Sequence, residues 1–220
     1  MTAARGTGQR RAASVPSRKP AAQFVDPEVS QRKFARELAE YRMEQDAYEA
    51  KGWFLLNSEY PIVRVLMVAA NLKPPALITE VRFDYTNYDA LPPSVVFVNP
   101  LTGTPLQMKE IGFPPLIRAV GPAPVLPGAP PGLSVPPPSQ SLLTAHSADE
   151  VPFICVAGVR EYHQHPAHTG DPWDLHRASG AGRLVRLLNV IYTYGVQPIR
   201  DYRYQLTIQV AGLMAGPPPI

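Results

Sequence analysis

Proline is the residue type that most limits what this chain can fold into. The 220 residues include 27 prolines, well above average usage, and many of these prolines lie between residues 113 and 139. Proline has no backbone N–H to give to a ladder, so the stretch 113–139 is not expected to pair in a sheet. We predict one domain over residues 26–212, with an extended proline-rich insertion at about 113–148 and a proline-rich tail at 213–220.

The first 25 residues are small, basic and without apolar periodicity, which predicts a disordered tail. This tail accounts for the net charge of +3 and the pI near 9.0, so neither value indicates a nucleic-acid-binding domain. The single cysteine excludes an intrachain disulfide and favours a reducing compartment, so we expect a cytoplasmic protein. The longest apolar run, 62–72, is interrupted by Arg64 and Asn71 and is too short for a membrane span.

Hydrophobic periodicity predicts two helices with strands between and after them. The first helix has a cap at Asp26, a proline at its first position and a natural end at Gly52, and the second covers 182–194. The expected strands cover 61–68, 78–85, 94–98, 151–165 and 206–210. The order of elements predicts an α+β domain with an antiparallel meander. One face of the first helix is expected to be solvated, with Arg32, Lys33, Arg36, Glu40 and Glu44.

The segment from Cys155 to His176 holds the residues that are best suited to chemistry. It contains the single cysteine and four of the five histidines. Thiolate and imidazole are preferred ligands of zinc, and a carboxylate can complete a four-coordinate site. We therefore predict a bound metal ion, zinc in the first place. Its ligands are drawn from Cys155, Glu161, His163, His165 and His168.

The expected strand sets a geometric condition on this site. The four odd-numbered candidates would face the same side of a regular strand. Cys155 and Glu161 would still lie about 20 Å apart at about 3.3 Å per residue, so a turn at Gly158 would have to bring the thiol back. Pro166 ends the strand and leaves His168 on a loop that can reach the same ion. Two aromatic residues are expected to wall the site, Tyr162 and Trp173.

Two interpretations compete with the metal site. Cys155 can be a buried strand residue beside surface histidines, since free cysteine behaves as a small hydrophobe. Alternatively, Cys155 forms a nucleophilic pair with His163 or His165, oriented by Glu161 or Asp171. An apolar strand is not where thiols are activated, which favours the metal.

The pattern C-x5-E-Y-H-x-H-P-x-H in this segment resembles a bacterial family known as the predicted metal-binding domain with Cys, Glu, His and His. Members of that family are found beside genes for a ubiquitin-like protein, its activating enzyme and a peptidase. The resemblance implies that Cys155, Glu161, His163 and one of His165 or His168 are the ligands. It also implies that the ubiquitin-like protein, its activating enzyme or both are partners. From the charge distribution and the short apolar run, we expect no nucleic acid or membrane partner.

A wider resemblance is to the ubiquitin-conjugating enzyme fold. A helix leads into a meander, then come the proline-rich entry YDALPPSVVFVNP, the pair His165-Pro166 and a further helix. In that family the acceptor cysteine follows the His-Pro pair, whereas Gly170 to Trp173 here contains no cysteine and Cys155 precedes the pair. We therefore expect a metal-binding, conjugating-enzyme-like component of a bacterial ubiquitin-like modification pathway. A metal-dependent hydrolase and a Cys/His nucleophilic enzyme are the alternatives.

Overall fold

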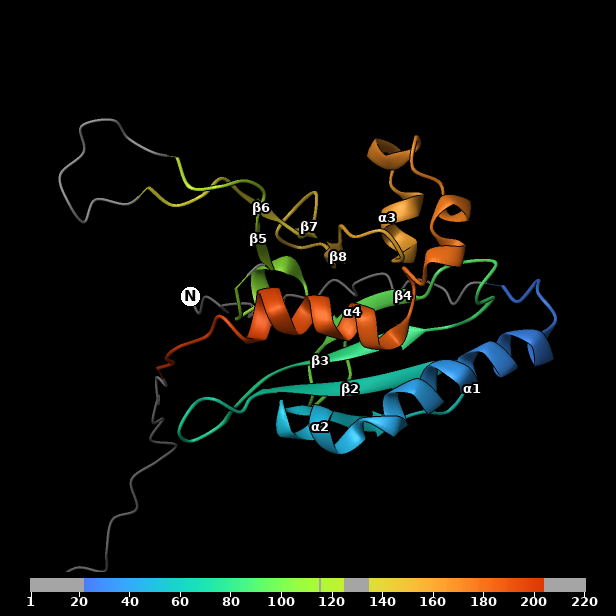
Figure 1. Cartoon of the computed structure of the whole chain (residues 1–220), viewed down its shortest axis with the longest axis horizontal. Coiled ribbons are helices and arrows are strands. Elements are labelled where there is room, and N and C mark those ends of the chain that lie inside the picture. Colours follow the sequence, from blue (N-terminus) through green and yellow to red (C-terminus); the bar gives the residue numbers. More distant parts are fainter. Residues whose placement is uncertain (1–21, 115, 125–134, 204–220) are drawn as a thin grey trace, which may run out of the picture.

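The structure is a computed structural model that describes residues 22–114, 116–124 and 135–203. A four-stranded antiparallel sheet in the order β1-β2-β3-β4 forms its centre (Figure 1). Each strand pairs with the next one along the chain, so the sheet is a meander and the predicted α+β class is confirmed. The strands are β1 (Trp53–Asn57), β2 (Ile62–Ala69), β3 (Ala76–Asp84) and β4 (Ser94–Val98).

Helix α1 (Pro27–Met43) begins where the sequence predicts. The Asp26 carboxylate caps it by accepting the backbone N–H of Glu28 at 2.9 Å. The helix does not run unbroken to Gly52, because a second short helix, α2 (Gln45–Ala50), follows it. Gly52 then has a φ of +94°, and an added side chain would lie 2.1 Å from a carbonyl oxygen of β2. Glycine is therefore required at the turn into β1, a strand that the periodicity does not predict.

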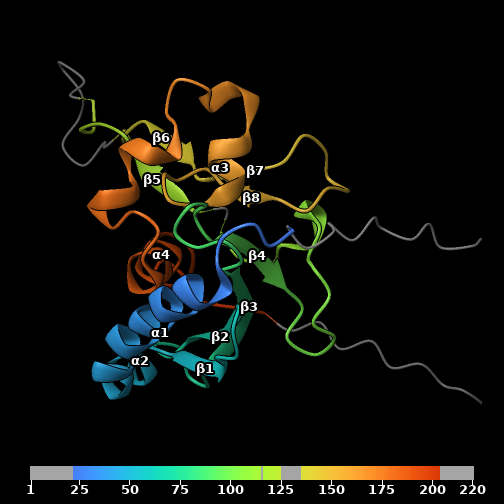
Figure 2. The same ribbon diagram turned by 90° about the vertical axis from the view of Figure 1, so that its right-hand side faces the viewer.

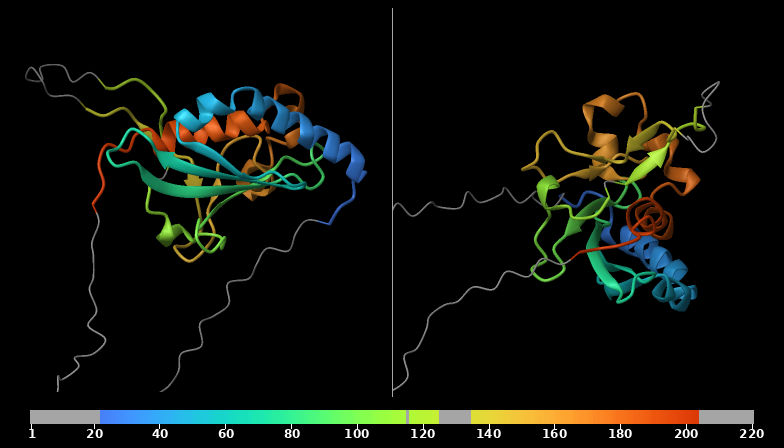
Figure 3. Two further views of the ribbon diagram at one scale, coloured as in Figure 1. Left: turned by 90° about the horizontal axis from the view of Figure 1, so that it is seen from below. Right: turned by 90° about the vertical axis from the view of Figure 1, so that its left-hand side faces the viewer.

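Helices α1 and α4 (Leu184–Ile191) pack against each other on one face of the sheet (Figure 3, left). In the core below them Val65, Val81 and Phe97 form a row of directly paired strand residues that are at most 1% exposed. The apolar stripes that the periodicity predicts are Phe34, Leu38, Tyr41 and Tyr48 in the first helix, and Leu184, Leu187, Leu188 and Ile191 in the second. All of these side chains are buried except Tyr48, which lies on α2 and is half-buried against the core.

The proline-rich stretch does pair in a sheet, and the expectation that it cannot is wrong. Strand β5 (Ile117–Ala119) pairs antiparallel with β6 (Ser139–Ser141). Leu116 and Leu142, which adjoin these strands, are 0% and 1% exposed. The paired residues include no proline, because the prolines lie beside the ladder and remove none of its N–H donors. The middle of the stretch, 125–134, lies outside the described residues.

The expected strand over 151–165 is wrong beyond its first residues. The short strand β8 (Phe153–Ile154) pairs with β7 (Leu143–Thr144), and the chain then forms helix α3 (Arg160–Gln164). Arg160 explains where α3 begins. Its buried guanidinium donates to one backbone carbonyl oxygen at the end of β3 and to two in the segment between β3 and β4. A period-two count does not anticipate a buried arginine that donates to three carbonyl oxygens.

Helix α3 and the hairpins β5–β6 and β7–β8 lie together beside β4, on the side away from β1 (Figure 2). The candidate site is in this region. Short helical turns complete the described part: η1 (Met108–Glu110), η2 (Pro166–His168), η3 (Trp173–Leu175), η4 (Arg177–Ser179) and η5 (Tyr192–Val196).

The described part begins with residues that the sequence assigns to the disordered tail. Asn87 holds them: its Oδ1 accepts the backbone N–H of Val25 at 3.0 Å and its Nδ2 donates to the carbonyl oxygen of Ala22 at 2.8 Å. The rest of that tail, the expected strand 206–210 and the tail 213–220 lie outside the described residues. Across the ranges that are described, no helix is long and apolar enough to cross a membrane.

Candidate thiol and imidazole site

The chain around Cys155 is fixed by its backbone. The Cys155 N–H donates to the carbonyl oxygen of Leu142 at 2.7 Å. Gly158 then turns the chain with a φ of +99°, and a side chain there would lie 2.1 Å from the carbonyl oxygen of Ala181. This close approach requires glycine at position 158. After this turn, α3 and η2 lead the chain back toward the thiol of Cys155.

His168 is the residue that meets the thiol. Its Nε2 lies 3.3 Å from the Sγ of Cys155. His165 caps η2, since its Nδ1 accepts a backbone N–H of that turn at 3.2 Å, and Pro166 takes the first position. The His-Pro pair thus begins the turn that carries His168. The sequence suggests His163 or His165 as the partner of a reactive thiol. In the structure, His168 is the histidine that contacts the thiol.

The hairpins beside the site influence the thiol of Cys155. Cys155 is half-buried, and burial raises its pKa above the ordinary value. A hydrogen bond with the Thr144 side chain and the positive charge of Arg118 act in the opposite direction, toward the thiolate. Thr144 lies on β7 and Arg118 on β5. The sequence offers no signal for these two residues, because pairing of the proline-rich stretch brings them to the site.

Tyr162 of α3 lies between His168 and Asp171. Its ring stacks on the His168 imidazole with centroids 4.0 Å apart, and its hydroxyl donates to Asp171 Oδ2 at 2.6 Å. The other carboxylate oxygen, Oδ1, lies 2.5 Å from Nε2 of His176. These two hydrogen bonds lower the pKa of Asp171, while burial and the hydrogen bond to Asp171 raise the pKa of Tyr162 to about 12. At neutral pH the phenol is therefore the donor and the carboxylate the acceptor.

Two of the predicted metal ligands bond elsewhere. The Glu161 carboxylate accepts a hydrogen bond from the Ser94 hydroxyl, which ties α3 to β4. His163 has its Nε2 3.0 Å from the backbone N–H of Gly158, which donates to it, and its Nδ1 2.9 Å from the carbonyl oxygen of Asp171. Both contacts suit a neutral ring, and burial lowers the pKa of His163. In this arrangement Glu161 ties α3 to β4, and His163 bonds to the backbone of Gly158 and Asp171.

The imidazole of His165, another candidate ligand, lies near that of His168, which contacts the thiol. Within the described residues, the Nε2 of His165 is buried and has no hydrogen-bond partner. The centroid of its ring lies 5.7 Å from that of His168. His146, the fifth histidine, stacks on His165 at 5.3 Å, a neighbour that sequence spacing does not indicate. Cys155 and His168 are therefore the two candidate ligands that the described structure brings into direct contact. Among the described side chains, no three or more of His, Cys, Asp and Glu are arranged to hold a metal ion, and zinc stays a prediction.

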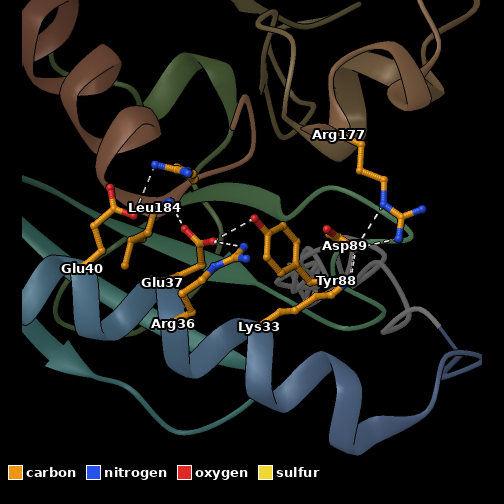
Figure 4. A network of polar contacts seen from close by, with 9 residues as sticks. Lys33, Arg36, Glu37, Glu40, Tyr88, Asp89, Arg177 and Leu184 are labelled. Atoms are coloured by element: carbon orange, nitrogen blue, oxygen red, sulfur yellow. Dashed lines mark hydrogen bonds and ion pairs between the residues drawn. The ribbon is translucent and has the colours of Figure 1, made fainter. Parts of the chain in front are cut away.

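A buried carboxylate connects the two helices that support the sheet (Figure 4). Glu37 of α1 is 1% exposed, and its Oε1 accepts the Tyr88 hydroxyl at 3.1 Å. Its Oε2 accepts the first backbone N–H of α4, that of Leu184, at 3.2 Å. Arg36, which lies at the surface, also donates to Oε1, at a distance of 3.0 Å. Glu37 thus acts as an N-cap for α4 from a different helix.

A second carboxylate holds the loop that contains the site (Figure 4). Asp89 forms ion pairs with Lys33 of α1 and with Arg177 of η4, whose Nη2 lies 2.8 Å away. The backbone carbonyl oxygen of Asp89 also accepts the indole N–H of Trp173 at 2.8 Å. The sequence predicts a solvated face of α1, and Lys33 departs from it by holding the loop.

These elements define an α+β protein with a thiol–imidazole pair on the loops beside β4. The chain belongs to the Y4jH family, whose profile matches residues 25–199. It is 39% identical over 207 residues to the uncharacterized protein y4jH of Sinorhizobium fredii (strain NBRC 101917 / NGR234), which covers 91% of this chain and 98% of that protein. The family match includes the whole segment from Cys155 to His176.

Proposed function

We propose that this chain is a cytoplasmic, conjugating-enzyme-like component of a bacterial ubiquitin-like modification pathway, in which Cys155 accepts an acyl group. The observation that carries the proposal is the 3.3 Å contact between the Cys155 sulfur and His168 Nε2, on the turn that begins with His165-Pro166. The order of residues along the chain argues against Cys155 as an acceptor, because it precedes the His-Pro pair. The contact in space between Cys155 and the turn that begins with the His-Pro pair supports the proposal despite that order.

The arrangement of the elements supports the same class. Helix α1 enters a four-stranded meander, the His-Pro turn lies beside β4, and α4 packs with α1 over the sheet. This is the order that the resemblance to conjugating enzymes implies. By that resemblance, the partner is a ubiquitin-like protein, its activating enzyme or both.

The chemistry that the site favours is transfer of an acyl group between thiols. His168 Nε2 takes the proton of the Cys155 thiol, and the sulfur attacks the carbonyl carbon of an incoming thioester. A new carbon–sulfur bond forms at Cys155, and the old one breaks. The leaving thiolate takes up the proton. Burial raises the pKa of the Cys155 thiol, and Thr144 and Arg118 act against it, toward the anionic sulfur that this step requires.

Zinc binding is a second candidate, and the unpartnered Nε2 of His165 favours it. Zinc bonds of about 2.3 Å to sulfur and about 2.0 Å to nitrogen allow Cys155 and His168 to reach one ion. A closed site would make the chain a structural adaptor, and an open coordination position would suit a hydrolase.

The experiment that separates these functions uses the full chain and a small glycyl thioester. We expect intact-mass spectrometry to show one acyl adduct that is absent in Cys155→Ser and forms about 100-fold more slowly in His168→Ala. His146→Ala is the matched control, because His146 stacks on His165 and, in the described structure, forms no hydrogen bond to the thiol. Formation of the adduct at equal rates in the wild type and His168→Ala would overturn the proposal.

Metal analysis of the same preparations tests the second candidate. Stoichiometric zinc in the wild type that is lost in Cys155→Ser and retained in Glu161→Gln, with no acyl adduct, would replace acyl transfer by zinc binding. Loss of the metal in Glu161→Gln as well would support the ligand set that the family resemblance implies.

A further inference from the structure

Tyr162 is held from two sides at the candidate site. Its ring stacks on the His168 imidazole, with centroids 4.0 Å apart and an interplanar angle of 27°. Its hydroxyl donates to Asp171 Oδ2 at 2.6 Å. The nearest other ring against His168 in the described structure is that of His165, at 5.7 Å and tilted by 53°. Tyr162 therefore sets the plane in which the His168 ring lies.

Asp171 is in turn fixed by the loop around it. Its Oδ1 contacts His176 Nε2 at 2.5 Å, and its carbonyl oxygen lies 2.9 Å from His163 Nδ1. Its backbone N–H donates to the carbonyl oxygen of His168 at 3.0 Å. Asp171 thus connects with the backbone of His168 as well as with the phenol that stacks on its ring.

We propose that Tyr162 and Asp171 are positioning residues that hold the His168 imidazole against the Cys155 thiol. This inference rests on the proposed function, since it assigns a role in the same thiol–imidazole pair. In the described part of the chain, neither residue forms a hydrogen bond to the sulfur. Tyr162 acts through the stacked ring, and Asp171 acts through the Tyr162 hydroxyl. The result is a chain of contacts in which each member orients the next.

The positions of the two residues predict graded effects of substitution. Tyr162→Phe keeps the stacked ring and loses the hydrogen bond, so we expect acyl transfer to Cys155 to slow about threefold. Tyr162→Leu removes the aromatic face and should slow it at least about tenfold. Asp171→Asn retains an acceptor oxygen for the phenol and should stay close to the wild-type rate, whereas Asp171→Ala should match Tyr162→Phe.

The test is a double-mutant cycle on acyl transfer from the small glycyl thioester to the full chain. If Tyr162 acts through His168, Tyr162→Leu slows transfer in the wild-type background and has no further effect in the His168→Ala background. Equal slowing in both backgrounds, or no slowing in either, overturns the inference. Circular dichroism of each variant checks the fold, and Tyr162→Phe, which keeps the packing, gives an answer if Tyr162→Leu does not fold.

The two proposals fail in different ways in this experiment. If His168→Ala alone leaves the rate unchanged, the proposed function is wrong and the positioning role falls with it. If His168→Ala slows transfer and the Tyr162 and Asp171 variants do not, the proposed function stands and the positioning role is wrong.

Discussion

Replacing the buried carboxylate of Glu37 should destabilise the whole domain. Glu37 is 1% exposed, and it accepts the Tyr88 hydroxyl at 3.1 Å and the Leu184 backbone N–H at 3.2 Å. In Glu37→Ala both donors lose their acceptor, and neither has free access to water because Tyr88 is 4% and Leu184 0% exposed. Arg36, by contrast, is largely exposed and can return to solvent.

The size of the effect follows from the two buried donors. Each unsatisfied buried group costs about 1–3 kcal/mol, so Glu37→Ala should lower the free energy of unfolding by about 2–6 kcal/mol. That is a large part of the roughly 5–15 kcal/mol that stabilises a typical domain. Glu37→Gln keeps a carbonyl oxygen for one donor and should lose about half as much.

Urea unfolding followed by circular dichroism measures this difference. Glu44→Ala is the matched control, because Glu44 lies exposed at the end of the same helix and should change stability by less than about 0.5 kcal/mol. An unfolding free energy for Glu37→Ala equal to that of Glu44→Ala would refute the reasoning that Glu37 satisfies the start of α4.

Three further predictions concern the site region. Burial lowers the pKa of His163 below 6.5, so as the pH drops the unfolded chain binds the proton before the folded chain does. The stability of the fold should therefore decrease below about pH 6.5. In thermal unfolding, His163→Gln should lose less stability over the same pH range than the wild type. Gly158→Ala should destabilise by several kcal/mol in urea unfolding, since its side chain would meet a carbonyl oxygen at 2.1 Å, while Gly170→Ala has open space and should change little. Arg118→Ala and Thr144→Val should each raise the pH midpoint of thiol alkylation by iodoacetamide, because each side chain acts against the burial that raises the thiol pKa. An unchanged or lower pH midpoint contradicts this account.

The helices and the central strands could be predicted because their residues obey simple periods. Helix α1 has its cap at Asp26, and β2 alternates between buried and half-exposed positions along its whole length. Strand β1 could not be predicted from periodicity, because its sequence is apolar on both faces. Phe54 and Leu56 point to solvent there, at 38% and 49% exposure.

The site could be predicted as a segment but not as a geometry. The clustering of histidines with Cys155 is visible in the sequence, and the structure brings His168 to the thiol. The choice of partners depends on α3 being a helix, which is set by bonds of Arg160 to backbone far away in the sequence. Reading the same residues as a strand puts Glu161 and His163 on one face with Cys155, whereas the structure has both residues on helix α3.

The central claim is that His168 activates the thiol of Cys155. The most direct measurement is the rate of iodoacetamide alkylation of Cys155 in the wild type and in His168→Ala at about neutral pH, with a metal chelator present. We predict that the wild-type thiol reacts at least about tenfold faster than the thiol of the variant. Equal rates in the two proteins would contradict the account.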